Sequence, residues 1–334
     1  MKNIIFETIN LQLFADGAVN MNVNSTLSPG LSVENKTYYD KNLIKEAQPN
    51  LIHDQFAVKK PIPKNGGKTI EFRRYAGLPK ALTPLTEGVT PDGQSLNATA
   101  ITAEVSQYGA YVTLTDILDL TAIDNNVLEA VTAIGNQAGV TLDTITRNVL
   151  QSGTNVYYCP KADGTEVTSR ADLDDTCVMT LDVIKDIAAL LKSVNAPKID
   201  GSYVAIIHPF VAADIMKCDG WVDVFKYKNP ENIYEGELGK IAGVRFVESS
   251  EAKIYDNGVF GCIFLGAGAY GTTEIEGGGL QTIIKQRGSA GTADPLDQRS
   301  SVGWKATKTA EILLDPYMYR VECKSSLSGK AKVN

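Results

Sequence analysis

The longest series of apolar residues at helical spacing lies between Asp124 and Leu150. Its members recur at steps of three and four residues: Val127, Val131, Ile134, Ala138, Leu142, Ile145 and Val149. This spacing is typical of a helix that buries one face. Asp124 is a suitable N-cap, and Gly153 can take a left-handed backbone conformation just after the last turn. Asp143 and Arg147 fall off the apolar stripe, so we expect them to face water.

A long β-hairpin pattern precedes this helix. Apolar and polar residues alternate over Lys68–Tyr75 and again over Thr99–Leu114, which predicts two strands. Residues 77–97 between them contain several prolines and glycines and predict an irregular tip. A two-stranded hairpin is marginally stable alone in water, and its edges favour further pairing. We therefore expect it to pack on another subunit; the alternative is that it packs on its own domain.

The first 36 residues have the pattern of an arm. An alternating stretch, Ile9–Phe14, is followed by a run rich in Asn and Ser, and together they are too short and polar to form a core. We expect the arm to be disordered or to dock on another surface, such as a neighbouring copy. Glu7 interrupts the first apolar run and no cleavage site follows, which argues against a secretory signal. No apolar run is long enough to cross a membrane.

The rest of the chain mixes short strands with helices. A short helix is predicted over Tyr38–Gln48, and another over Leu181–Val194 with Thr180 as its cap. Ser202–Ile207 predicts a buried strand, after which His208 and Pro209 begin a helix that continues to Lys217. Further strands are predicted at Ile241–Val247, Val259–Leu265, Gln281–Lys285, Trp304–Leu314 and Tyr317–Lys324. The glycine-dense stretch 266–279 predicts tight turns.

The composition of the chain restricts the classes of protein to which it can belong. The chain has 334 residues, 43% of them apolar, and a net charge of −7. This acidic balance argues against a protein that grips nucleic acid in a basic groove, but it permits one that encloses nucleic acid. Five scattered cysteines without a C-x-x-C pair are typical of reduced thiols.

Few residues suggest chemistry. Gly266–Gly271 matches G-x-G-x-x-G after a strand, but the residues that follow predict strand and turn instead of the helix that a dinucleotide site needs. His53 and His208 are widely separated, and we expect a structural role for His208. Asp172–Asp175 lacks the Gly and Glu of a calcium loop. We predict no catalytic, cofactor or metal site; a nicotinamide-dependent enzyme that uses the glycine run is the alternative of another class.

What remains favours association between copies. The arm, the hairpin tip and the charged stretch 294–299 are all suited to contacts with other molecules. The residues expected at such contacts are Leu11, Leu13, Phe14, Arg73, Arg74, Lys80, Glu87, Asp294, Asp297 and Arg299. Together these features predict a homo-oligomer with many contacts per subunit.

Several stretches resemble a known family. They are Leu11–Ala15 (LQLFA), Leu85–Gly93 (LTEGVTPDG), Gln107–Val112 (QYGAYV), Ile207–Pro209 (IHP), Tyr234–Phe246 (YEGELGKIAGVRF) and Asp294–Lys305. In this order, with the arm, hairpin and long helix, they resemble the major capsid proteins of tailed bacteriophages, and in particular the family named for the coat protein of a short-tailed coliphage. The resemblance covers residues 35–325.

The resemblance implies an α+β fold, the tailed-phage major capsid fold with an N-terminal arm, an extended β-hairpin loop, a long spine helix, a peripheral domain and an axial domain. The expected ranges are the arm at 1–36, a short helical segment at 37–55, the extended hairpin loop at 56–115, the peripheral domain with the spine helix at 116–175 and 259–325, the axial domain at 176–258, and a C-terminal tail at 326–334.

The resemblance also implies a function. A non-enzymatic coat protein of this kind assembles as hexamers and pentamers into an icosahedral shell around double-stranded DNA, without sequence-specific DNA binding. The arm is too short to hold a fused scaffold, so a separate scaffolding protein is an expected partner, with a portal and a decoration protein. The expected location is the virion, after assembly in the host cytoplasm and without a membrane. An encapsulin-like compartment shell is the alternative within the same fold.

Overall fold

The computed structural model describes residues 51–75, 77–85, 87–90, 92–121, 126–218, 239–289 and 294–334. The chain forms two compact units, and within the described residues the first contains 109–138 and 280–305 while the second contains 51–108, 139–279 and 306–334. The predicted arm, with Leu11, Leu13 and Phe14, lies outside the described residues, as does the predicted helix Tyr38–Gln48.

A seven-stranded sheet forms the centre of a lobe in the second unit. Its order is β5-β14-β10-β6-β8-β7, with β9 on β10. The strands are β5 (Val156–Tyr158), β6 (Tyr203–Ile207), β7 (Lys240–Ile241), β8 (Val244–Glu248), β9 (Ile254–Tyr255), β10 (Val259–Leu265) and β14 (Met318–Cys323). The prediction for β10 is confirmed to the residue, because an unbroken apolar run suits a central strand that is buried on both faces.

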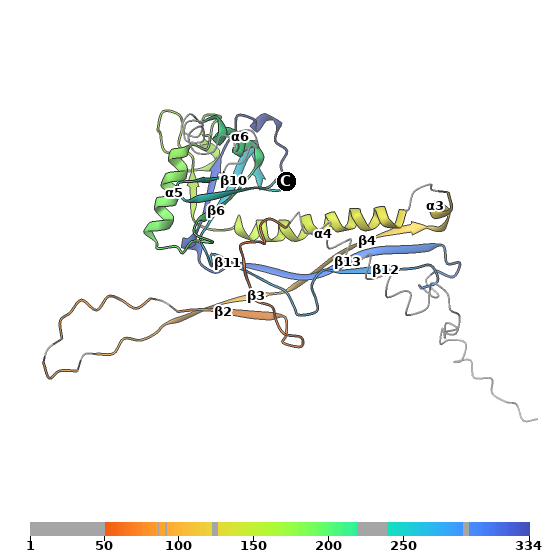
Figure 1. The fold of residues 1–334 in the computed structure, drawn as a ribbon, viewed down its shortest axis with the longest axis horizontal. Coiled ribbons are helices and arrows are strands. Elements are labelled where there is room, and N and C mark those ends of the chain that lie inside the picture. The colour runs from red at the N-terminus through yellow and green to blue at the C-terminus, as the bar shows by residue number, and fades with distance from the viewer. Residues whose placement is uncertain are drawn as a thin grey trace, which may run out of the picture. The chain divides into compact units, whose positions relative to one another are not determined.

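Two helices of this lobe, α5 (Leu181–Ser193) and α6 (Pro209–Lys217), lie beside the sheet (Figure 1). The predicted cap is confirmed: Thr180 accepts a hydrogen bond from the Val183 backbone N–H. The His208 ring caps α6 in the same way, and Pro209 occupies the first helical position. Both helices share one apolar core with alternate residues of β6, and the intervening residues of β6 pack with Leu150 and Tyr270. The sheet is therefore covered on both faces.

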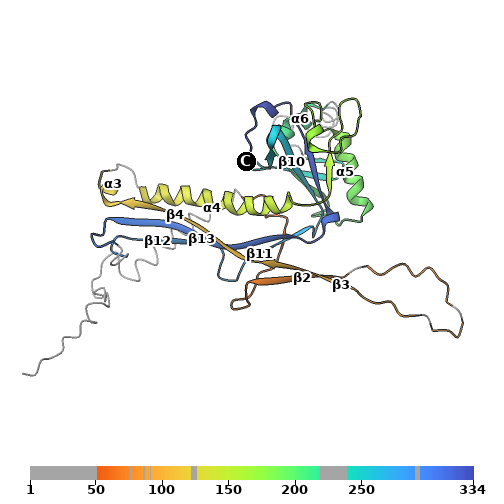
Figure 2. The same cartoon turned by 180° about the vertical axis from the view of Figure 1, so that it is seen from behind.

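The predicted hairpin is present in the second unit. Strands β2 (Thr69–Tyr75) and β3 (Ala98–Glu104) pair antiparallel over their whole length, and the described residues between them, 77–85, 87–90 and 92–97, belong to the connecting loop (Figure 2). The single long strand predicted over Thr99–Leu114 is wrong. It is interrupted at Val105, and β4 (Ser106–Thr115) then pairs with β13 (Arg299–Ile312). The predicted strand is divided because its first part pairs with β2 and its second part pairs with β13, which lies far away in the chain.

A five-stranded sheet has the order β1-β11-β13-β12, with β4 also on β13. The new strands are β1 (Val58–Lys59), β11 (Tyr270–Thr273) and β12 (Gln281–Lys285). In the first unit, β4 approaches β13 closely, because a Cβ added at Gly109 would lie 2.6 Å from the Trp304 carbonyl oxygen. This approach gives a structural reason for the glycine in the QYGAYV stretch.

The long helix is confirmed as α4 (Asn126–Leu150), preceded by α3 (Asp116–Thr121). Its proposed cap, Asp124, lies outside the described residues. Gly153 is not among the residues with positive φ; instead, a side chain there would collide with Met318. The expectation that Asp143 and Arg147 face water is also wrong, because they are 0% and 3% exposed. Residues remote in the sequence cover this part of the helix.

Two further expectations need correction. The strand predicted over Ile241–Val247 is the hairpin β7–β8, because Ala242 and Gly243 both have positive φ and form a turn. The glycine-dense stretch 266–279 contains β11 as well as turns. The seven-stranded sheet contains strands from both sides of the domain boundary expected at 258–259, since β6 pairs with β10; the boundary itself stays a prediction. Single-turn 3₁₀ helices complete the fold at Arg170–Asp172, Asp256–Gly258, Asp315–Tyr317 and Ser328–Lys330. Within the described ranges, no helix has both the length and the apolarity needed to cross a bilayer.

Candidate inter-subunit surfaces

The hairpin tip, defined here as residues 77–97, is an exposed apolar loop wherever the structure describes it, at 77–85, 87–90 and 92–97. Five of its large apolar side chains face solvent: Leu78, Leu82, Leu85, Val89 and Leu96. Leu82 is 81% exposed and Leu85 is 77% exposed. So many exposed aliphatic side chains in one loop are typical of a surface that another molecule covers. The sequence predicted Lys80 and Glu87 as contact residues here, and both are exposed.

A cationic hollow lies at the root of the same hairpin. It has a volume of about 240 Å³, and its lining residues are Lys60, Phe72, Arg73, Arg74, Ile101, Gly268, Leu313 and Leu314. The lining thus combines three bases with four large apolar side chains and contains no acid. The predicted contact residues Arg73 and Arg74 are both in it. Lys60 was missed, because only the pairing of β1 with β11 brings it there.

Local contacts shape the hollow. Phe72 is the buried residue of β2, and a Cβ at Gly271 would lie 3.2 Å from its ring. The Lys60 ammonium lies 5.8 Å from the centre of the Phe72 ring. Arg73 Nε donates a 3.2 Å hydrogen bond to Glu71, and this bond raises the pKa of Arg73. The floor of the hollow is therefore apolar and its rim is positively charged.

The glycine run 266–271 contributes a turn to this region. Gly268 has a φ of +76°, and β11 begins at Tyr270. A dinucleotide motif needs a helix at that point, so that the helix N-terminus can meet the pyrophosphate. The strand that occupies the position leaves the run without that geometry. Among the described residues, no group of three His, Cys, Asp or Glu side chains could hold a metal ion.

Just ahead of β1, the chain is held by a buried pair. The His53 backbone N–H donates to Asp143 Oδ1 at 2.7 Å, and the His53 ring Nδ1 lies 2.6 Å from Asp143 Oδ2. Both side chains are almost fully buried. A buried carboxylate costs free energy unless it is paired and hydrogen-bonded, and here both oxygens are engaged. The pair attaches the segment that precedes β1, and that leads into the hairpin, to the second half of α4.

A second ion pair lies next to it. Lys308 Nζ on β13 is 2.9 Å from Asp54 Oδ1, and both side chains are largely buried. The Tyr270 hydroxyl donates a hydrogen bond to the His53 carbonyl, and burial raises the pKa of Tyr270. We call His53, Asp54, Asp143, Tyr270 and Lys308 the root anchor. No local pattern in the sequence predicts this cluster, because its members come from four distant segments.

The first unit has its own exposed apolar residues. Tyr111 on β4 and Ile117 and Leu120 on α3 all face solvent, as does Leu296 in the 294–299 loop. In that loop, Asp294 is buried, accepts a 2.7 Å hydrogen bond from the Arg299 backbone N–H and lies 3.7 Å from Arg299 Nε. It is therefore a poor candidate for an outer contact, whereas Asp297 and Arg299 are exposed.

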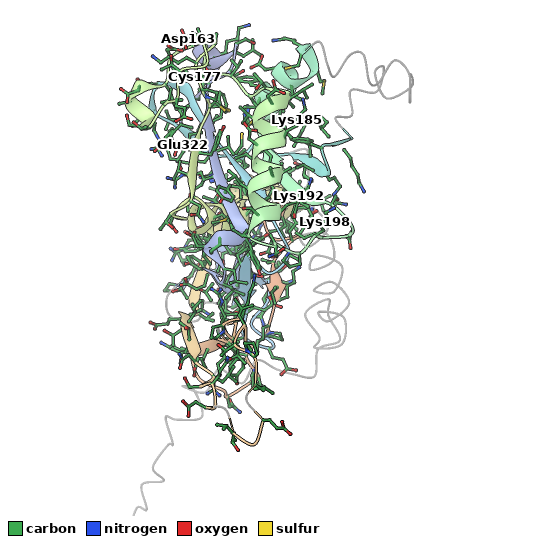
Figure 3. The ribbon with its side chains drawn as sticks, turned by 90° about the vertical axis from the view of Figure 1, so that its left-hand side faces the viewer. Asp163, Cys177, Lys185, Lys192, Lys198 and Glu322 are labelled. Carbon is green, nitrogen blue, oxygen red and sulfur yellow. The ribbon has the colours of Figure 1, made fainter. Side chains whose placement is uncertain are left out.

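Some charged side chains of the lobe are exposed to solvent, and others are buried in ion pairs. Figure 3 shows Lys185 and Lys192 along α5 and Lys198 beyond its end; all three side chains are exposed. Glu322, by contrast, is fully buried and receives two 2.6 Å hydrogen bonds from the Arg170 guanidinium. That bidentate bond raises the pKa of Arg170 and satisfies the buried carboxylate.

Comparisons with known proteins identify the family of the chain and structures with a similar fold. Residues 98–317 match the family described as phage capsid protein. The fold is similar to the capsid structure of Cyanophage P-SCSP1u (TM-score 0.63, 14% identity, 81% of this chain and 87% of that chain). It is also similar to the Cyanophage Pam1 capsid (0.62, 12%, 83% and 92%) and the capsid of Ralstonia phage GP4 (0.59, 14%, 81% and 87%). No curated protein sequence matches the chain.

Proposed function

The chain belongs to the phage capsid protein family and is a structural subunit of a bacteriophage capsid, and we propose that it closes the shell by laying its β2–β3 hairpin on a neighbouring copy. The exposed apolar tip carries this proposal. Burying one leucine side chain contributes roughly 1.5–3 kcal/mol, so covering several of them stabilises each contact substantially. A shell then gains its strength from many such contacts per particle.

The root anchor supports the proposal because it holds the chain that leads into the hairpin in place. A two-stranded hairpin is marginally stable alone, so an unanchored one could not hold a neighbour in a defined place. Here the chain before β2 pairs with β11, and Asp143 and Lys308 hold the two residues His53 and Asp54. We assign to these contacts the role of fixing the direction in which the hairpin leaves its own unit.

The exposed residues of β4 and α3 provide a second contact surface in this proposal. Tyr111, Ile117 and Leu120 present aromatic and aliphatic area that water would otherwise cover. Asp297 and Arg299 supply charged groups from the first unit that can set the register of such a contact.

The lobe around the seven-stranded sheet corresponds to the axial domain in this proposal. Its range extends the expected 176–258 by β5, β10 and β14, since these strands belong to the same sheet. The remainder of 116–175 and 259–325 is then peripheral domain. The assembly would contain hexamers and pentamers around double-stranded DNA, with a scaffolding protein and a portal, and no enzymatic activity. The net charge of −7 supports enclosure of DNA without adhesion to it.

Replacing the tip tests the proposal. Tyr75 and Ala98 are direct partners across the hairpin, so Asn-Gly in place of residues 76–97 closes the two strands with a two-residue turn. We expect the full chain to form shells or rings by electron microscopy and sedimentation. The shortened chain should keep its circular dichroism spectrum and form no closed shells. Normal particles from the shortened chain would overturn the proposal.

A further inference from the structure

We infer that the cationic hollow at the hairpin root is the receptor for the distal tip, residues 85–93, of a second copy of this chain. The inference rests on the proposed function, because it names the surface on which the hairpin tip docks. It is carried by the charges, the apolar lining and the size of the hollow.

Charge complementarity is the first argument. The hollow is lined by Lys60, Arg73 and Arg74 and by no acid. Among the described residues, neither Lys60 nor Arg74 has an acidic partner within salt-bridge distance, and the Arg73–Glu71 pair is exposed and therefore weak. The distal tip carries two acids, Glu87 and Asp92, and no base. Opposite charges of this kind set partner choice and register between protein surfaces.

The apolar lining is the second argument. Phe72 is buried and Leu313 and Leu314 are half-buried, so the two leucines supply the part of the apolar wall that is open to solvent. In the tip, Glu87 is flanked by the exposed side chains of Leu85 and Val89. A docked tip can therefore place its acids against the rim and its aliphatic groups against the wall.

The volume of the hollow favours a peptide side chain over a drug-sized ligand or cofactor as its occupant. Pockets for drug-sized ligands and cofactors measure roughly 300–1,000 Å³. The hollow, at about 240 Å³, is smaller and suits one or two inserted side chains. Most residues of β2 and β3, which contribute to its lining, are exposed and can contact the rest of a loop.

The occupant comes from another copy. In this structure, no residue of the tip lines the hollow, and Leu85 and Val89 stay exposed. A contact between two different surfaces of identical chains is heterologous, and repeating such a contact produces a ring when the rotation closes. Rings of five and six copies are the units that the proposed function requires.

Charge reversal tests the inference. One variant carries Glu87→Lys and Asp92→Lys, a second carries Lys60→Glu and Arg74→Glu, and a third carries all four changes. Lys192→Glu on α5 is the matched control, since Lys192 is exposed on a different element. We expect each two-residue variant to lose shells at least tenfold by sedimentation and electron microscopy, while the four-residue variant and the control assemble normally. Thermal unfolding of the isolated subunit checks that all variants fold.

Mixing separates contacts between copies from contacts within one chain. An equimolar mixture of the two two-residue variants pairs each altered tip with an oppositely altered hollow, so we expect it to regain assembly. Rescue in the four-residue variant without rescue on mixing would show that the hollow binds its own tip and would overturn the inference. A disulfide trap gives independent evidence: oxidised Glu87→Cys/Arg74→Cys should form covalent ladders that Glu87→Cys/Lys192→Cys does not form.

The remaining outcomes are also distinct. Normal assembly of either two-residue variant would overturn the inference. If the Lys60→Glu/Arg74→Glu variant forms shells that no longer retain DNA and tip reversal has no effect, the hollow binds phosphate instead. If replacing the tip abolishes shells but charge reversal does not, the proposed function stands and this receptor is wrong. Shells formed by the chain without its tip would refute both.

Discussion

The imidazole Nδ1 of His53 lies 2.6 Å from Oδ2 of Asp143, although 90 residues separate them in the chain. The other carboxylate oxygen accepts the His53 backbone N–H at 2.7 Å, and both side chains are buried. Asp143 therefore fixes the backbone and the side chain of the residue that leads into the hairpin. This connection joins the segment that leads into the exposed hairpin to the long helix α4.

Asp143→Ala is expected to destabilise the subunit strongly. It leaves the buried His53 N–H and ring without their acceptor, and breaking a buried pair of this kind costs about 3–5 kcal/mol. Urea denaturation of the isolated subunit measures the change in the free energy of unfolding. Glu166→Ala is the control, since Glu166 is exposed, and it should change that free energy by less than about 0.5 kcal/mol. Equal effects of the two changes would contradict the role given to the root anchor.

Gly109→Ala is expected to weaken the pairing of β4 with β13. The added methyl group would lie 2.6 Å from the Trp304 carbonyl oxygen, and overpacking of this kind costs about 1–3 kcal/mol. Gly77→Ala is the matched control, because nothing lies within 4 Å of a Cβ there. Thermal unfolding should separate the two variants clearly. Identical melting temperatures would show that the strands are not in close contact at Gly109.

His208 is expected to make stability depend on pH. Burial lowers its pKa below the ordinary value of 6.5, and the rings of Phe210 and Phe260 lie 4.7 and 5.0 Å away. As the pH falls below 6.5, the unfolded chain binds a proton that the folded protein resists, so stability is lost. His208→Asn keeps a side chain that can cap α6 but removes the titration.

The measurement is the free energy of unfolding at about pH 7.5 and about pH 5.5 for both proteins. The wild-type protein should lose more stability on acidification than the variant, whatever the offset between them at the higher pH. Equal losses would show that His208 does not contribute to the pH dependence.

Leu82→Ser and Leu85→Ser together are expected to abolish shell formation without destabilising the subunit. Both side chains are exposed in the isolated chain, so the free energy of unfolding should change by less than about 0.5 kcal/mol. Val333→Ser removes another exposed aliphatic side chain, 58% accessible and near the C-terminus, and serves as the control. Native gels and negative-stain images should show particles for the control alone. Particles from the double variant would mean that the tip is not a major contact.

Local chemistry explains what the sequence predicted well. The unbroken apolar run 259–265 gave β10 its bounds, and Thr180 identified the start of α5. The hairpin was visible because alternation and turn residues act over a few neighbours. Arg73, Arg74, Lys80 and Glu87 were chosen as candidate contact residues from that hairpin; the structure shows where they lie on it, and their contacts with another copy stay a prediction.

What the sequence did not reveal depends on distant partners. The sequence predicted that Asp143 and Arg147 face solvent, yet both are buried. Asp143 contacts the His53 ring, and the Arg147 guanidinium donates a hydrogen bond to the Glu251 carbonyl oxygen. Lys60 joins the hollow only through β1 and β11. Periodicity and spacing within one segment do not identify contacts between residues 90 or more positions apart.

The central claim is that the apolar tip is covered only when copies of the chain surround one another. A cryo-electron microscopy map of particles formed by the purified chain tests it directly. The account predicts closed shells in which residues 77–97 of every subunit lie against another subunit, with Leu82 and Leu85 removed from solvent. A protein that stays monomeric under all assembly conditions, with a scaffolding protein included, or shells in which the tips remain in solvent, would contradict it.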